Sequence, residues 1–358
     1  SRFFITHFFN PPRYMKLVEI IPSTKTDASL IKPIADFMEN TLGKGVVYAK
    51  DTPNFIANRI GVYGMMATLE AARKMKLSIE DVDALTGTLI GRPKSATFRT
   101  ADVVGLDTMC FVANTAYEKC ISDPEREKFK IPDYLQKMID NEWLGQKSKQ
   151  GFYKKIDKGV IHSIDLDTLE YSPQVKKRYA GIGLAKEHIG VGDKIKALVN
   201  SDDVAGEFIW EVTASALLYS AGRLGEIADD IVNIDRAMKW GFGWNMGPFE
   251  VWDAIGVEAA VKRMKSENRD VPSWVLKFID KGHSTFYSVL EDVRSYWDVS
   301  SESYAPLPTS KKEISFLDYQ NNNVIENHWS ASIVDLGDGV AGVNFHSVLQ
   351  AELNPIDG

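Results

Sequence analysis

The fold of this chain is decided by a stretch that occurs twice, first as Ala101-Asp102-Val103-Val104-Gly105-Leu106-Asp107 and about 151 residues later as Trp252-Asp253-Ala254-Ile255-Gly256-Val257-Glu258. The echo extends upstream, where Ser78–Asp83 corresponds to Ala228–Asp235. Both copies combine helically spaced apolar residues with a glycine that can end a helix. The repeat predicts two copies of one helical module, at about 51–140 and 200–297, which we expect to pack together as a pseudo-dimer. Two unrelated helical bundles are the alternative.

The composition excludes several classes of protein. With 358 residues, 44% hydrophobic and 25% charged, the chain can form two or three globular domains. Its net charge of −7 argues against broad nucleic-acid binding, because an acidic protein gains nothing from counterion release. No apolar run reaches about 18 residues, so we expect no membrane span.

The cysteines predict the compartment. Cys110 and Cys120 form neither a CxxC pair nor a Cys/His cluster, so we expect no metal site and no disulfide framework. A reducing cytoplasm is the simplest location.

The first 50 residues have the pattern of a small sheet with one helix. We expect strands at Phe3–Phe9 and Met15–Ile21, joined by a turn at Asn10-Pro11-Pro12, and a third strand at Val46–Ala49. The spacing of apolar residues predicts a helix over Asp27–Leu42. A long helix is expected to begin at Asp51-Thr52-Pro53, because a capping residue precedes a proline there.

The later segments differ in polarity. Residues 154–180 are polar and are interpreted as a linker between the helical blocks at 51–153 and 181–297. Within 298–358, Ala331–Phe345 alternates strongly around Gly337-Asp338-Gly339, which predicts a hairpin. The chain begins inside a strand-like run and ends abruptly, so we expect it to be cut at both ends.

The sharpest candidate for chemistry is His7 with Glu19, twelve residues later. Two strands joined by a proline turn would bring both side chains to one edge of the sheet. A carboxylate beside an imidazole fixes its tautomer and stabilises its charged form, as a general base that takes a proton from an alcohol requires. On the pattern alone, a histidine satisfied within the core is the more common interpretation.

Four motifs resemble those of 3-hydroxyacyl-CoA dehydrogenases, and they occur in that family's order. They are Thr6–Pro12 with Met15–Ile21, Gly43–Arg59, Trp143–Tyr153 and Gly243–Glu250. The resemblance implies a mainly α fold with a small remnant of an α/β Rossmann sheet and two repeated helical domains like those of 6-phosphogluconate dehydrogenase. Residues 1–50 would be the end of the NAD-binding domain.

The resemblance also implies roles for particular residues. His7 and Glu19 would be the catalytic pair, and Asn58, with Asn10, would hold the oxygens of the substrate. The reaction implied is oxidation of an (S)-3-hydroxyacyl-CoA to the 3-ketoacyl-CoA with NAD as hydride acceptor, in fatty-acid β-oxidation. In the second repeat, the position that corresponds to Asn58 is occupied by Ile209. That repeat is therefore interpreted as structural.

Two departures from the family pattern qualify these implications. The first repeat has Gly91-Arg92-Pro93-Lys94 where the family often has a Met-Gly-Pro-Phe loop. No GxGxxG dinucleotide fingerprint occurs in the chain, so we expect no cofactor-binding residues here, no tight NAD binding by this chain alone and no activity from it.

The tail suggests a multifunctional parent protein. Ser330–Ser347 with Asn354–Asp357 resembles the opening strands of an enoyl-CoA hydratase (crotonase) domain. That resemblance implies acyl-CoA substrates, and a homo-oligomer or a thiolase partner for the parent. Two alternatives stay open: a non-catalytic assembly or substrate-lid module, and a related dehydrogenase that acts on a short hydroxy acid.

Overall fold

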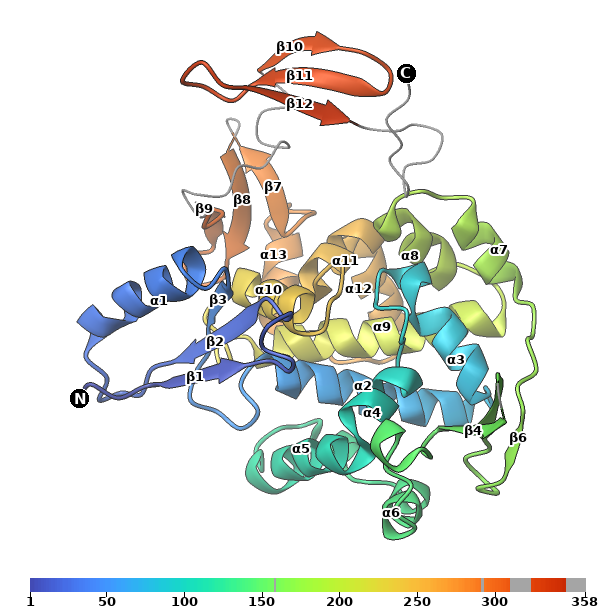
Figure 1. Ribbon diagram of the computed structural model, residues 1–358. Helices are drawn as coiled ribbons and strands as arrows, with labels where there is room; N and C mark the ends of the chain where they lie inside the picture. The colour runs from blue at the N-terminus through green and yellow to red at the C-terminus, as the bar shows by residue number, and fades with distance from the viewer. Residues whose placement is uncertain (158, 291–292, 310–322, 346–358) are drawn as a thin grey trace. The chain divides into compact units, whose positions relative to one another are not determined.

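A computed structural model describes residues 1–157, 159–290, 293–309 and 323–345 (Figure 1). The chain divides into two compact units, Ser1–Phe286 and Tyr287–Gly358. The first unit contains a small sheet and all thirteen α-helices of the described residues, so the fold is mainly α.

The sheet at the N-terminus has the order β1-β2-β3, where β1 is Ile5–Phe8, β2 is Leu17–Ile21 and β3 is Gly45–Tyr48. β1 runs antiparallel to β2, and β3 runs parallel to it. Helix α1, Ile31–Asn40, connects β2 to β3. The three predicted strands and the predicted helix are confirmed, each with slightly different bounds.

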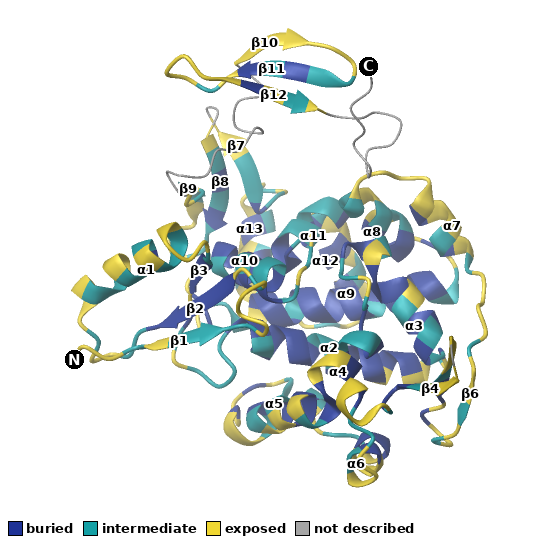
Figure 2. Ribbon diagram, viewed as in Figure 1, coloured by how far each residue is buried: buried dark blue, intermediate teal, exposed yellow. Residues whose placement is uncertain are grey.

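Strand β2 is buried along its whole length because both of its faces are covered (Figure 2). Val18 and Ile20 pack with Ala35 of α1. On the other face, Leu17 lies so close to Gly241 that a side chain on this glycine would clash with it. Side chains alternate along a strand, so Glu19 shares the face of Leu17 and points toward the helices.

The helices form two modules with the same order. The first has α2 (Ala57–Lys74), α3 (Ile79–Thr86), α4 (Phe98–Val104), α5 (Leu106–Lys119) and α6 (Asp133–Asp140). After α7 (Ala180–Lys186) and α8 (Val191–Val199), the second has α9 (Val204–Arg223), α10 (Ile231–Gly241), α11 (Pro248–Ile255), α12 (Val257–Ser266) and α13 (Ser273–Asp280). The long helices α2 and α9 lie side by side (Figure 1). Between them the rings of Tyr63 and Tyr219 stack, with centroids 3.7 Å apart.

The repeated aspartates hold equivalent helices in the two modules. Asp83 in α3 accepts a hydrogen bond from the N–H of Phe98 (2.7 Å), the first residue of α4. Asp235 in α10 accepts one from the N–H of Phe249 (2.9 Å), at the start of α11. Helix N-termini have unpaired N–H groups, so a buried carboxylate satisfies both its own needs and theirs.

A second pair of aspartates extends this correspondence. Asp102 in α4 accepts hydrogen bonds from the N–H groups of Phe152 (2.8 Å) and Tyr153 (2.9 Å). Asp253 in α11 accepts one from the N–H of Phe286 (2.7 Å). Each carboxylate therefore binds backbone that follows the last helix of its own module. This shared hydrogen bonding explains why the aspartates recur in the sequence.

Two expectations about the first unit are wrong. The segment 154–180, expected to be a linker, contributes to an antiparallel sheet of β4 (Tyr153–Asp157), β5 (Val160–Ile164) and β6 (Tyr171–Pro173). The end of β5 is buried, and its Ser163 donates a hydrogen bond to Glu80 of α3 (2.7 Å). The segment looked like a linker because the other strand residues are mostly exposed and polar.

The position at which α2 begins also differs from the one expected from the sequence. The helix begins at Ala57, several residues after the expected cap at Asp51, because Asn54 and Phe55 have φ values of 66° and 52°. Left-handed residues interrupt an α-helix. The N–H groups at the start of α2 donate their hydrogen bonds to a side chain of strand β2, which is described below.

The second unit consists of short strands. β7 (Tyr287–Leu290), β8 (Val293–Asp298) and β9 (Ser303–Pro306) form one antiparallel sheet. The helical block, expected to run to 297, is therefore shorter: its last helix ends at Asp280, and β7 and most of β8 lie within the range expected to be helical. β10 (Val324–Asn327), β11 (Ala331–Asp335) and β12 (Ala341–Phe345) form another sheet, and its β11–β12 hairpin confirms the predicted one. The expected crotonase-like residues 354–357 lie outside the described residues.

A buried ionic network fixes the first turn of α2. The side chain of Arg59 is fully buried, and it donates hydrogen bonds to Asp123 (2.6 Å), to the hydroxyl of Tyr219 in α9 (2.6 Å) and to Glu226 (3.1 Å). Its Nη1 donates to the sulfur of Cys120. Arg59 therefore ties α2 to α9 and to the segment after α5.

We expect Arg59→Met to lower the free energy of unfolding of this chain by about 3–5 kcal/mol, because it removes the closest cation of the buried Asp123 carboxylate and leaves only Arg223, 3.4 Å away. Urea titration followed by circular dichroism measures this change. Arg73→Met is a matched control on the same helix, because Arg73 and its partner Asp167 are more than half exposed. The control should cost less than about 1 kcal/mol. Equal losses for both variants would contradict the assignment.

The burial of Asp102 predicts a pH dependence. Burial raises the pKa of Asp102 to about 6, although the N–H groups of Phe152 and Tyr153 oppose the shift. A raised folded-state pKa means that the folded chain binds the proton more tightly, so this contribution to stability is complete below about pH 4 and is lost as pH rises through 6. Between pH 4 and pH 7.5 the free energy of unfolding of the wild type should fall by roughly 2–3 kcal/mol relative to that of Asp102→Asn. If the wild type instead becomes more stable relative to Asp102→Asn as pH rises, the two hydrogen bonds outweigh burial and lower the pKa of Asp102.

Candidate active site

His7 and Glu19 face each other across the β1–β2 pair. The two residues are register partners, and Nδ1 of His7 lies 2.6 Å from Oε2 of Glu19. The imidazole is 29% exposed, whereas the carboxylate is completely buried. The sequence-based expectation of hydrogen-bonding distance is therefore confirmed, and one end of the pair is open to solvent.

The second oxygen of Glu19 caps helix α2. Oε1 accepts hydrogen bonds from the N–H groups of Ile56 and Ala57, both at 3.0 Å. A carboxylate at a helix N-terminus is stabilised by the unpaired N–H groups and by the helix dipole. Oε1 therefore has two backbone donors, while Oε2 is bound by the imidazole of His7.

This arrangement fixes the tautomer of His7. An ionised carboxylate only accepts hydrogen bonds, so Nδ1 of His7 is the donor. Nε2 then carries the free lone pair and is the atom that can take a proton. The rings of Phe9 and Phe55 lie 5.1 and 5.4 Å from the imidazole centroid and restrict its rotation.

The other two residues expected at the site have different positions. Asn58 lies in the first turn of α2, directly after Ala57, and is partly buried. In the described part of the chain no hydrogen bond engages its side-chain amide, which leaves it available to a ligand. Asn10 is exposed in the turn between β1 and β2, and no hydrogen bond within the described residues joins it to His7 or Glu19.

The end of α10 closes this region from the second module. The ring of Phe242 lies 6.0 Å from that of Phe9. A Cβ atom on Gly61 of α2 would lie 2.0 Å from the Phe242 ring, so only glycine permits this contact. Sequence reasoning missed both residues, and the glycine inside a predicted helix was the available signal.

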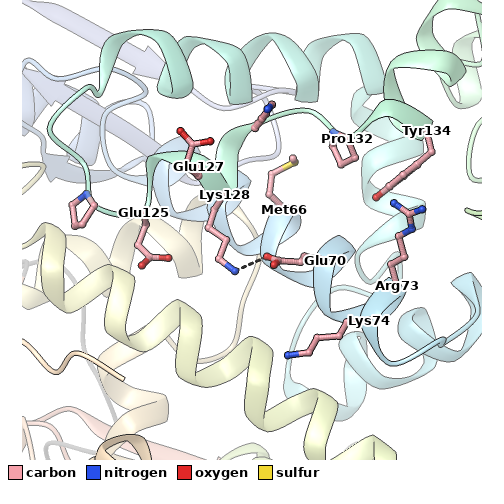
Figure 3. A pocket seen from close by; sticks show the side chains of 11 residues that line it. Met66, Glu70, Arg73, Lys74, Glu125, Glu127, Lys128, Pro132 and Tyr134 are labelled. Atoms are coloured by element: carbon pink, nitrogen blue, oxygen red, sulfur yellow. Dashed lines mark hydrogen bonds and ion pairs between the residues drawn. The ribbon is translucent and has the colours of Figure 1, made fainter. Parts of the chain in front are cut away.

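A cavity lies beside the second half of α2, away from His7 (Figure 3). Its lining includes Glu70, Arg73 and Lys74 from the second half of α2, with Lys128 from the segment before α6 and Tyr134 from α6 itself. Charges of both signs line it, and Lys128 pairs with Glu70. It contains none of the residues around His7, so its size does not mark it as the catalytic site.

Among the other described histidines, His328 also contacts a glutamate, since its Nε2 lies 3.0 Å from Oε1 of Glu326, but both of those side chains are exposed. His188 and His328 are exposed, and His283 stacks on Phe278 with centroids 5.4 Å apart. Across the described ranges, no three His, Cys, Asp or Glu side chains come together as a metal site. None of the helices in those ranges is long and apolar enough to cross a membrane.

Two family models match this chain. The model described as the NAD binding domain of 3-hydroxyacyl-CoA dehydrogenase matches residues 1–52. The model described as the C-terminal domain of the same enzyme matches residues 55–155 and 208–294, which include most of both helical modules.

Individual relatives agree with these matches. A probable 3-hydroxyacyl-CoA dehydrogenase of Bacillus subtilis is 48% identical over 97% of this chain and 44% of its own length. A putative fatty acid oxidation complex trifunctional enzyme of Rickettsia felis is 32% identical over 70% of this chain and 34% of its own. The crystal structure of 3-hydroxybutyryl-CoA dehydrogenase from Escherichia coli K12 shares the fold, with a TM-score of 0.50 and 19% identity over 77% of this chain and 70% of that one.

The chain spans less than half the length of these two curated relatives. Both parts of the dehydrogenase are nevertheless represented, since one family model matches the sheet that carries His7 and Glu19 and the other matches the helices that carry Asn58. This chain belongs to the 3-hydroxyacyl-CoA dehydrogenase family.

Proposed function

We propose that a full-length protein containing this chain is an NAD-dependent (S)-3-hydroxyacyl-CoA dehydrogenase of fatty-acid β-oxidation. The observation that carries this proposal is the buried Glu19 carboxylate, which binds His7 and the first turn of α2 together. A substrate-lid module without catalysis would not need a buried carboxylate beside a partly exposed imidazole. An alcohol dehydrogenation can use this pair, because it needs a base for the hydroxyl proton.

In the proposed reaction, Nε2 of His7 accepts the proton of the 3-hydroxyl group while the hydrogen on C3 leaves as hydride. Bound NAD supplies the hydride acceptor. Glu19 keeps Nδ1 of His7 protonated and stabilises the imidazolium that forms. Its own position is held by α2, so the base needs little reorganisation during the reaction.

Asn58 is the proposed substrate-positioning residue. It follows the two N–H groups that bind Glu19, and its amide has no partner within the described residues. An amide can donate to the developing ketone oxygen or to the thioester oxygen. Asn10, exposed in the β1–β2 turn, is assigned a secondary role in binding the substrate.

The chain supplies only part of the cofactor site in this proposal. The parallel pairing of β2 with β3 is the type of sheet on which dinucleotide-binding domains are built. The glycine-rich loop that would cradle the pyrophosphate does not occur in this sequence. The chain's own contribution is therefore the base, its carboxylate and the helical domain that covers the substrate.

The helical modules and the tail fit a larger assembly. We propose that the modules pack as a pseudo-dimer around α2 and α9, and that β11–β12 belongs to a crotonase-like part of the parent. A homo-oligomer or a thiolase partner would suit a protein that processes acyl-CoA in successive steps.

Glu19→Gln in the full-length enzyme should lower kcat by roughly 10²- to 10⁴-fold, with little change in folding or NAD binding. The amide oxygen can still accept from Ile56 and Ala57, but a neutral amide does not stabilise an imidazolium. Steady-state kinetics with 3-hydroxybutyryl-CoA measures the effect. Asp36→Asn on α1, which removes an exposed carboxylate from the same region, should be neutral. Wild-type turnover in Glu19→Gln would contradict the catalytic role of the pair and would indicate that His7 is a structural residue.

The chain by itself should bind NAD no more tightly than millimolar, because it lacks the phosphate-cradling loop. Isothermal titration calorimetry of this 358-residue chain with NAD tests this expectation. The full-length protein is the positive control. Micromolar binding by the chain alone would show that the missing loop is not required.

A further inference from the structure

The cavity beside the second half of α2 has no role in the proposed reaction (Figure 3). Its volume is about 660 Å³, a size that is typical of binding sites for small organic molecules. One wall is a single face of α2, because positions 66, 70, 73 and 74 recur at helical spacing. The other wall comes from residues 124–134, so a ligand held here would contact two separate segments of the first unit.

Tyr134 brings an unsatisfied hydroxyl group to this cavity. The residue is only 6% exposed, yet no hydrogen bond within the described ranges engages its hydroxyl. Figure 3 shows the hydroxyl end of the ring pointing into the cavity, beside the guanidinium of Arg73. Burial raises the pKa of Tyr134, so the hydroxyl stays protonated and can donate a hydrogen bond. Because buried polar groups normally have a partner, this hydroxyl calls for an acceptor inside the cavity.

Arg73 supplies a cation next to this hydroxyl. Its guanidinium lies over the ring of Tyr134, 5.4 Å from the centroid. Among the described residues only its Nε donates a hydrogen bond, to Asp167 (2.9 Å), so its Nη groups can donate to a ligand. The ring and the aspartate hold the planar guanidinium in one orientation. That orientation suits it to bind an anion through two parallel hydrogen bonds.

The charges around the cavity are separated (Figure 3). Tyr134, Arg73 and Lys74 lie at one end, whereas Glu125 and Glu127 lie at the other. The first end carries hydrogen-bond donors and positive charge, so it calls for an anion. Ionised carboxylates only accept hydrogen bonds, so the second end calls for hydroxyl or amino groups.

The middle of the cavity is less polar than its ends. The charge of Glu70 is balanced there by its ion pair with Lys128. Met66 and Pro132 add apolar surface to the lining. The carbon atoms of a ligand can therefore pack between the two polar ends. The whole arrangement suits a molecule with an anionic group at one end and hydroxyl groups at the other.

We propose that this cavity binds a sugar phosphate, either free or as the end of a nucleotide, with its phosphate at the Arg73 end and its hydroxyl groups at the carboxylate end. A terminal phosphate carries about two charges and three acceptor oxygens, enough for Arg73, Lys74 and the hydroxyl of Tyr134 together. The diphosphate bridge of NAD has no terminal group of this kind, so weak binding of NAD by this chain is compatible with the site. The site is separate from the proposed active site and does not depend on it.

Isothermal titration calorimetry of the 358-residue chain with ribose 5-phosphate and with adenosine 5′-monophosphate tests this proposal. At least one of the two should bind with a Kd below about 1 mM. Ribose and adenosine, which lack the phosphate, should not bind measurably. Tighter binding of the nucleotide would show that the base contributes, and equal binding would identify the sugar phosphate as the part recognised. No binding of either phosphate, or equal binding of the unphosphorylated compounds, would overturn the proposal.

Two variants connect the binding to this cavity. Tyr134→Phe removes only the hydroxyl group and should raise the Kd about threefold to tenfold. Arg73→Met should raise it about tenfold or more, because a charge-assisted hydrogen bond is lost. The ion pair of Arg73 is exposed, so this variant should still fold. Tyr117→Phe is the matched control, since Tyr117 also has an arginine over its ring, Arg126, but does not line the cavity. A Kd that neither Tyr134→Phe nor Arg73→Met changes would place the phosphate elsewhere and overturn the site.

Discussion

The carboxylate of Glu19 is the group on which the arrangement of this site depends. It is completely buried, and among the residues that the structure describes no lysine or arginine forms an ion pair with it. Its compensation comes from the imidazole of His7 and from two N–H groups at the start of α2. A buried charge that lost these partners would be strongly destabilising. Sheet, histidine and helix are thus constrained to one geometry.

Helix α2 transmits this geometry to the rest of the unit. Its first turn binds Glu19. The same turn carries the buried Arg59, which pairs with Asp123 and contacts α9. The first turn also carries Asn58, the proposed substrate-positioning residue. The position of the catalytic pair and that of the proposed substrate site therefore depend on one helix, which the second module holds in place.

Much of this could be predicted because the signals are local. The β-branched and aromatic residues of the first two strands, with the proline turn between them, were sufficient to place His7 and Glu19 at one edge of the sheet, and the two residues are register partners. The repeated aspartates predicted two modules with one order of helices. The start of α2 could not be predicted in this way, because its N–H groups are satisfied by a side chain 37 residues earlier in the chain. The sheet within 154–180 was missed for a similar reason, since the burial of Ser163 depends on α3.

The most direct test of this account is the tautomer of His7. Nitrogen-15 NMR of the full-length enzyme with labelled histidine, assigned by comparison with His7→Gln, reports which ring nitrogen carries the proton. The account predicts that, in the neutral ring, Nδ1 is protonated and Nε2 is free, because Glu19 only accepts hydrogen bonds. In Glu19→Gln this preference should weaken. A neutral ring protonated on Nε2 in the wild type would contradict the account, because the atom proposed to take the substrate proton would already hold one.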